Sequence, residues 1–131
     1  SNDDINRNTS TYVAYVFSEV EGYSKFGSYT GNGNTKGTFV FTGFRPAWVL
    51  LKRTDTSKNW LLHDSKRDGF NVRNEILYPN TSEAETNNAV DIDIVSNGFK
   101  LRSSGSAHNA SGGTYIYLCF AESPFKYARA R

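Results

Sequence analysis

Alternating apolar and polar residues mark two neighbouring segments as strands. Residues 90–95 alternate with a period of two, and residues 99–102 do so again after Asn97 and Gly98. This period places one face of a strand in the core and the other in water, and Asn-Gly favours a tight hairpin turn. The two segments therefore predict a β-hairpin.

Continuous apolar runs predict strands that are buried on both faces. Such runs occupy residues 11–20, 47–52, 60–63 and 114–120. The polar turn at 54–59 joins the second and third runs into a further predicted hairpin, and the turn cluster at 30–37 predicts another. Trp48 stands near the start of its run, so we expect it in the core.

Two long segments have no period, and we expect both to be loops. Residues 64–88 carry mixed charges, and residues 103–113 are rich in Ser, Gly and Asn, which predicts a flexible polar loop. A loop as long as 64–88 is unusual in a compact domain unless it carries a function or packs on itself. Short strands at this spacing predict an all-β fold, an antiparallel, jelly-roll-like β-sandwich of about eight strands. Residues 1–10 are expected to be a linker or arm, and residues 11–131 a single domain.

Composition narrows the class of protein. The 131 residues fit one domain, and aromatic residues make up 15% of them, so flat rings must supply much of the core. The net charge is +2 without a polybasic run, which argues against a nucleic-acid partner. The longest apolar stretch is too short for a membrane span. Cys119 is the only cysteine and lies in an apolar run, so it is expected to act as a small core residue.

The sequence contains no recognisable catalytic or metal motif. His63 and His108 are the only histidines, and neither stands at ligand spacing from another His or Cys. Asp91 and Asp93 share one strand face, which we expect to face water. The glycine-rich segment 31–37 lacks the Gly-Lys-Ser/Thr of a phosphate loop. We expect no catalysis, no metal and no cofactor, although a carboxylate pair brought together by folding stays open as an alternative.

Binding chemistry is densest at residues 59–68, where aromatic, imidazole and charged side chains follow a predicted strand. Sugar sites combine an aromatic face with polar groups that bond hydroxyls. The simpler alternative places Trp60 in the core and makes Asp64 and Arg67 an ion pair that holds the long loop. Including both loops, the candidate receptor or glycan contacts are Trp60, His63, Asp64, Arg67, Arg73, Tyr78, His108 and Asn109.

The chain starts much as it ends. Residues 11–19 and 114–122 share a Thr-Tyr start and a Phe and a Glu at the same offsets. The offset between the two copies is about the length of one domain, which suits a tandem array, and we favour a repeat. The alternative is that two aromatic strands of one sandwich converged on a similar sequence.

Three motifs in the sequence resemble those of a known family. They are YVAYVFSEVEGYSKFGSYTGNG, FVFTGFRPAWVLLKRTD and WLLHDSKRD, and the terminal FAESPFKYARAR resembles the end of the same chains. They resemble an uncharacterised β-rich domain of marine bacteriophage virion proteins, found in tail-fibre-like chains and often beside concanavalin-like domains. In such chains a strand of the Tyr-Val-Ala-Tyr-Phe-Glu type closes one β unit and a Gly-Tyr-Ser-Lys-Phe linker leads into the next, so the resemblance implies that residues 11–26 are the closing strand and linker of a preceding repeat. That family has no catalytic residues to carry over.

The resemblance implies a non-enzymatic domain on the virion surface, in the tail fibre or another tail part, that binds or adheres to the host. Its partners would be a host cell-surface glycan or protein and other virion proteins. By analogy it would form a homo-oligomer, a trimer as in many fibres. It would be made in the bacterial cytoplasm and act outside the cell as part of the particle. The alternative is a carbohydrate-binding module of a secreted or cell-surface bacterial protein.

Overall fold

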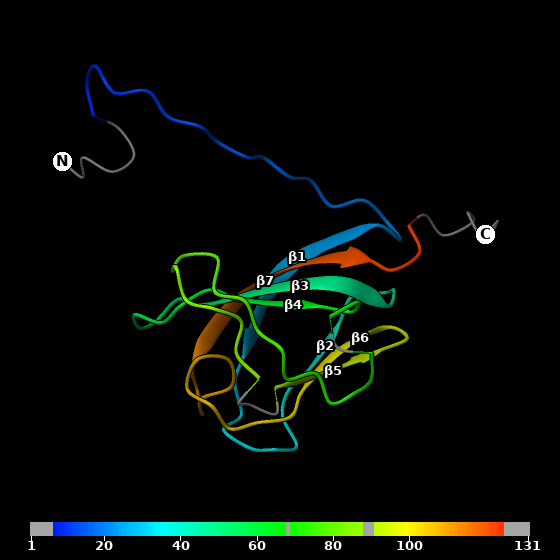
Figure 1. Cartoon of the computed structure of the whole chain (residues 1–131). Helices are drawn as coiled ribbons and strands as arrows, with labels where there is room; N and C mark the ends of the chain where they lie inside the picture. The colour runs from blue at the N-terminus through cyan, green and yellow to red at the C-terminus, as the bar shows by residue number, and fades with distance from the viewer. Residues whose placement is uncertain (1–6, 68, 88–90, 125–131) are drawn as a thin grey trace.

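The computed structural model describes residues 7–67, 69–87 and 91–124 (Figure 1). These residues form two antiparallel sheets, which confirms the predicted all-β sandwich. The first sheet has the order β1-β7-β3-β4 and the second the order β2-β6-β5. Their bounds are Ser24–Thr30 (β1), Phe39–Phe41 (β2), Pro46–Arg53 (β3), Leu61–Asp64 (β4), Ile92–Val95 (β5), Gly98–Leu101 (β6) and Thr114–Ala121 (β7).

The described residues contain no helix, and so none that could cross a membrane. Residues 1–6 of the predicted arm and residues 125–131 of the predicted domain lie outside this description. So does Val90, at the start of the predicted alternating strand.

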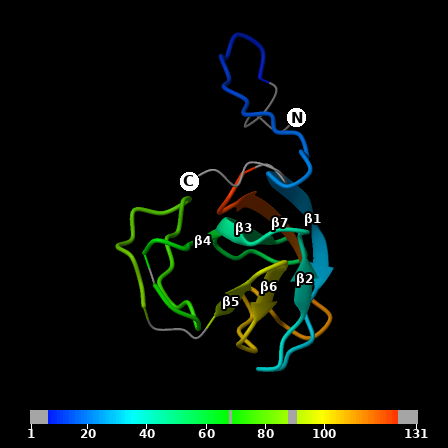
Figure 2. The same ribbon diagram turned by 90° about the vertical axis from the view of Figure 1, so that its right-hand side faces the viewer.

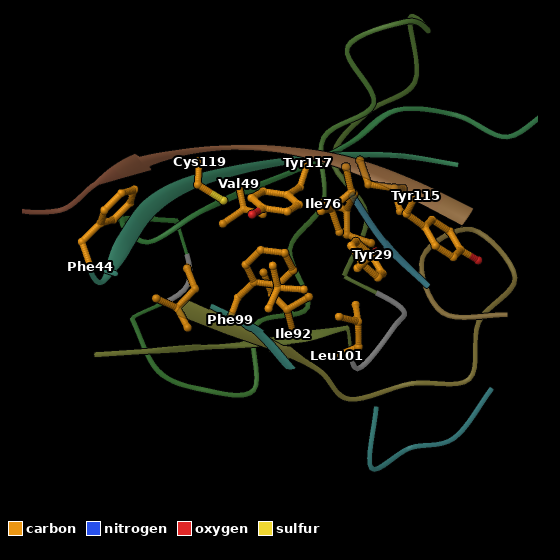
Figure 3. Packing of buried hydrophobic residues seen from close by; sticks show 14 residues of the cluster. Tyr29, Phe44, Val49, Ile76, Ile92, Phe99, Leu101, Tyr115, Tyr117 and Cys119 are labelled. Carbon is orange, nitrogen blue, oxygen red and sulfur yellow. The ribbon is translucent and has the colours of Figure 1, made fainter. Parts of the chain in front are cut away.

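The core lies between the two sheets (Figure 3). Val49 and Leu51 from the first sheet and Ile92, Phe99 and Leu101 from the second are fully buried. The alternating hairpin that the sequence predicts is present as β5 and β6, with Ile94 opposite Phe99. Period-two burial therefore decides which side chains of this hairpin meet the first sheet.

Aromatic rings fill much of the core, as the composition predicts. Tyr29 and Tyr115 lie opposite each other on β1 and β7 and stack with ring centroids 4.9 Å apart. Phe99 meets the edges of Tyr29 and Tyr117 from the second sheet. Cys119 is fully buried beside them, and burial raises the pKa of its thiol, so it is a core residue as expected.

The predicted buried strand at residues 11–20 is wrong. This segment is an exposed arm that leaves the sandwich (Figures 1 and 2), with Tyr15 83% and Val16 89% exposed. β1 instead begins at Ser24, within the predicted linker, because β7 offers it a complete antiparallel ladder from Ser24 to Thr30. Such pairing outweighs the weak strand preference of Gly27 and Ser28.

Trp48 is not a core residue. Val49 and Leu51 point into the sandwich, so by alternation Trp48 points to the outer face of the first sheet. There it is half-buried, with its ring 5.4 Å from that of Phe120. A continuous apolar run does not reveal which residues face inward, and this is why the sequence assigned Trp48 to the wrong side.

Candidate binding pocket

The long segment after β4 connects the two sheets. Leu77 exchanges two backbone hydrogen bonds with Leu62 of β4, at 2.9 and 3.1 Å. Arg73 donates its backbone N–H to the carbonyl of Ile92 in β5, at 2.8 Å. The predicted irregular loop is therefore tied to both layers in the parts that are described, and it forms one wall of a pocket.

The loop between β6 and β7 forms a second wall and is held firmly. Asn109 is fully buried, and its amide nitrogen lies 2.8–3.0 Å from Asn32 Oδ1, Asn34 O and Ser103 O. The hydroxyl of Tyr29 donates to the carbonyl of His108, at 2.7 Å. These bonds pin the loop to the 31–37 turn and to β1. The expectation of a flexible loop at 103–113 is thus wrong, because Asn109 acts as its internal anchor.

A pocket of about 270 Å³ lies between these walls. The segment before β4, the connecting segment, the residue before β5 and the β6–β7 loop all contribute to it. Its lining residues are Lys58, Asn59, Leu61, Ile76, Tyr78, Glu83, Asp91, Ala107 and His108. The volume is at the small end for ligand sites, which favours a single ring over an extended chain.

Asp91 and His108 face each other in the lining. His108 Nε2 lies 3.1 Å from Asp91 Oδ1, and the two side chains are 6% and 0% exposed. The contact does not meet the angles of a hydrogen bond, so these atoms and Asp91 Oδ2 have no hydrogen-bond partner among the described residues. Buried polar groups in this state favour a ligand that supplies donors and acceptors.

Burial controls the charge of this pair. It raises the pKa of Asp91 to about 7 and lowers the pKa of His108 to about 4, because each charged form loses its water. The mutual attraction of a carboxylate and an imidazolium opposes both shifts. Between about pH 4 and pH 7 the two pKa shifts favour the neutral forms of Asp91 and His108, each of which can donate and accept hydrogen bonds.

His63 does not line the pocket. It is fully buried on β4, and neither ring nitrogen has a hydrogen-bond partner among the described residues. Burial first, then the charges of His108 and Arg73, lower the pKa of His63 to about 3. The ring is therefore neutral near pH 7 and acts as part of the core, not as a surface contact.

The structure divides the eight predicted contact residues into two groups. His63, Arg73, His108 and Asn109 are buried, and of these His108 lines the pocket. Trp60, Asp64 and Tyr78 are half-buried and Arg67 is exposed, and of these Tyr78 lines the pocket.

The half-buried and exposed group shows local structural roles. Arg67 pairs with Glu85, at 2.5 Å, and not with Asp64 as the simpler alternative had it. Asp64 instead accepts a hydrogen bond from the backbone N–H of Lys66, at 2.7 Å. The backbone N–H of Trp60 donates to Asn80 Oδ1, at 2.9 Å, so this stretch is tied to the connecting segment.

Sequence reasoning missed the acidic member of the pocket. Asp91 was expected on a wet strand face with Asp93, yet it is fully buried, while Asp93 pairs with Arg102 at 3.3 Å. β5 begins only at Ile92, so Asp91 precedes the strand and does not share its alternation. The sequence shows Asp91 as a carboxylate among apolar neighbours, and its contact with His108 becomes visible only in the folded structure.

The comparisons with known proteins identify a family without an assigned activity. Residues 1–124 match the family model described as "Domain of unknown function (DUF7483)", so the chain belongs to this family. No curated protein and no solved structure matches the chain.

Proposed function

We propose that this member of the DUF7483 family is a non-enzymatic recognition domain on the surface of a bacteriophage virion, in a tail fibre or another tail-associated part. It binds the host by holding one sugar ring of a cell-surface glycan in the pocket. The observation that carries the binding proposal is the Asp91–His108 pair, whose buried polar atoms lack hydrogen-bond partners among the described residues. The virion setting rests on the resemblance of the sequence motifs.

Sugar hydroxyls match the chemistry of this pocket. A hydroxyl both donates and accepts, so one ring can bond to the carboxyl of Asp91 and to the imidazole of His108 once the side chains that bury these atoms move aside. Tyr78 supplies an aromatic wall, and its own hydroxyl lies 3.1 Å from Thr86 Oγ1, which orients the ring. Flat aromatic walls pack well against the apolar faces of sugars. Lys58 and Glu83 add charged groups at exposed positions of the lining.

The proposal excludes turnover. Acyl or glycosyl transfer needs a nucleophile or a second acid placed across a reacting bond. His108 Nε2 faces Asp91, the raised pKa of the buried Cys119 thiol keeps it protonated, and no group of three metal-binding side chains occurs in the described part of the chain. A glycan incubated with the protein should show no new reducing ends; their appearance would refute this part.

A binding panel tests the pocket itself. The whole chain is exposed to immobilised bacterial surface polysaccharides, and bound protein is measured for wild type, Asp91→Asn and Tyr78→Ala. Both variants should lose binding at least tenfold, because each removes one side of the ring's contacts. Trp60→Ala is the matched control, since Trp60 is a half-buried aromatic outside the pocket lining. The proposal would be contradicted if Trp60→Ala lost glycan binding while Asp91→Asn and Tyr78→Ala kept it.

The same pocket would serve the alternative, a carbohydrate-binding module of a secreted or cell-surface bacterial protein. Assembly distinguishes the two settings. A virion part copurifies with phage particles and is proposed to act as a homo-oligomer, a trimer by analogy with fibres, next to other virion proteins. A module of a secreted protein would bind glycan as a monomer and would be missing from particles.

A further inference from the structure

The outer face of the β1-β7-β3-β4 sheet, which points away from the core, is apolar although it would contact water. Phe26, Leu118, Leu50 and Leu62 lie opposite one another across the four strands and form a continuous row. Each is only half-buried. Trp48, Phe120 and Ile116 extend the row on the same face; these seven residues are called the outer apolar face below. An antiparallel sheet with one wet face usually carries polar residues there, so this face has the composition of a covered surface.

The exposed arm at residues 11–20 is the second apolar surface that this chain leaves uncovered. Val13 is 81% exposed, Tyr15 83% and Val16 89%. Exposed apolar side chains in such a run are costly in water, at roughly 25 cal/mol per Å². The face and the arm are thus two unsatisfied surfaces of the same character.

Phe17 shows that the outer apolar face accepts side chains from the arm. Its ring lies 5.9 Å from that of Phe120 in an edge-on contact and 6.2 Å from that of Phe26. In an extended chain, Tyr15 and Val13 share the side of Phe17, while Val16 points the other way. The same side of the arm is therefore suited to continue the contact that Phe17 begins.

The similarity between residues 11–19 and 114–122 also indicates which side of the arm suits the outer apolar face. Aligned with β7, Val13, Tyr15 and Phe17 stand where Ile116, Leu118 and Phe120 stand. Those three residues of β7 all belong to the outer apolar face. The arm thus carries, on one side, the kind of apolar row that β7 presents outward.

The base of the arm directs it away from its own sheet. Glu19 pairs with Lys25 at 2.8 Å and accepts the backbone N–H of Phe26 at 3.1 Å. Ser24 Oγ donates to the carbonyl of Ser18, at 2.9 Å. These bonds fix the exit direction, and the arm then extends outward (Figures 1 and 2).

We propose that the part of the outer apolar face beyond Phe17 is covered by residues 12–16 of the arm of a second copy of this chain. The exchange closes into a ring, either of two copies or of three with each arm on the next copy. Each aromatic side chain buries on the order of 150–250 Å² when covered. Tyr15 and Val13 from each arm, with the face beneath them, bring two exchanges to about the lower end of the 1,200–2,000 Å² of a stable interface.

Sedimentation of the whole chain tests the exchange. Wild type should have two or three times the mass of one chain, and Val13→Asp with Tyr15→Asp should have the mass of one. Val16→Asp is the matched control, with one added charge on the opposite side of the arm, and should keep the wild-type mass. A monomeric wild type would overturn the proposal and would assign the face to a different protein or to its own arm. An arm variant that stays oligomeric would also overturn it.

A mixing experiment separates exchange between copies from a contact within one copy. Leu50→Lys with Leu118→Lys places two positive charges on the face and should also give a monomer. Mixed with the aspartate arm variant, it should regain a ring of two copies, because one intact arm meets one intact face and the altered pair is oppositely charged. Two monomers that stay separate would overturn an exchange between two copies; a ring of three cannot alternate two variants and is tested by the arm variant and its control. Should the lysine variant fail to fold by circular dichroism, the arm variant and its control still decide.

Discussion

Replacing Asn109 tests whether one buried amide anchors the loop that carries His108. Its amide nitrogen has three acceptors within 2.8–3.0 Å, and its Oδ1 accepts the backbone N–H of Asn32 at 3.0 Å. A neutral hydrogen bond contributes about 0.5–1.5 kcal/mol, and some partners regain water when the amide is lost. Asn109→Ala should therefore lower the free energy of unfolding by about 2–4 kcal/mol.

Asn109→Asp sharpens the test because it keeps the shape and reverses the hydrogen-bonding role. The introduced carboxylate would face three oxygen acceptors in a buried site, so at pH 7 this variant should be less stable than Asn109→Ala. Burial raises the pKa of the introduced carboxyl above that in the unfolded chain. Its penalty is therefore small at low pH and grows as the pH rises through the folded-state pKa.

Urea unfolding followed by tryptophan fluorescence measures both effects. Asn34→Ala is the control, because that side chain is exposed and its Oδ1 accepts the nearby backbone N–H of Lys36, at 2.9 Å, while the backbone carbonyl that bonds to Asn109 is kept. It should change stability by less than about 0.5 kcal/mol. The reasoning is refuted if Asn109→Ala matches this control, or if Asn109→Asp equals Asn109→Ala at pH 7.

Three further variants test the core and the faces of the sheet. His63→Leu should raise the free energy of unfolding by about 1 kcal/mol at pH 7, because it removes buried ring nitrogens without partners among the described residues. It should also flatten the acid response, because the lowered pKa of His63 means that the share of stability linked to its neutral ring, complete above pH 6.5, is lost as the pH falls toward about 3; an unchanged pH profile would contradict this. Gly98→Ala should lower the free energy of unfolding by about 3 kcal/mol or more, because the added Cβ would clash with the Val40 carbonyl. Gly69→Ala is its control and should be neutral, because the added Cβ meets open space; equal melting temperatures of these two variants would contradict the close packing at Gly98. Trp48→Ala should cost about 1–2 kcal/mol, less than the 3–5 typical of a core tryptophan, and a full core cost by urea unfolding would return Trp48 to the interior.

The sequence predicted those parts of the fold that local pattern controls. The β5–β6 hairpin follows from alternation and from the turn at Asn97 and Gly98. β1 was missed because Lys25, Gly27 and Ser28 carry no strand signal, and β7 supplies the pairing that forms it. Local pattern also mistook the arm for a strand, because an apolar run does not state where its partner lies.

The pocket was only partly predictable for a related reason. Tyr78 and His108 were singled out by side-chain type, and both line it. Asp91 was assigned to a wet face because its contact with His108 spans the β5–β6 hairpin and depends on how the β6–β7 loop folds back. The buried state of Arg73 and Asn109 likewise follows from tertiary contacts, so their polar character alone pointed to the surface.

The most direct test of glycan recognition locates the bound sugar on the labelled whole chain. A polysaccharide that binds in the panel is cut to its constituent monosaccharides, and each is titrated while backbone amide signals are followed by NMR. The account predicts saturable shifts centred on Asp91, Ala107 and His108, with no saturable shift for the same sugar in Asp91→Asn. Shifts confined to the outer apolar face, or to the surface around Trp60 and Arg67, would contradict it.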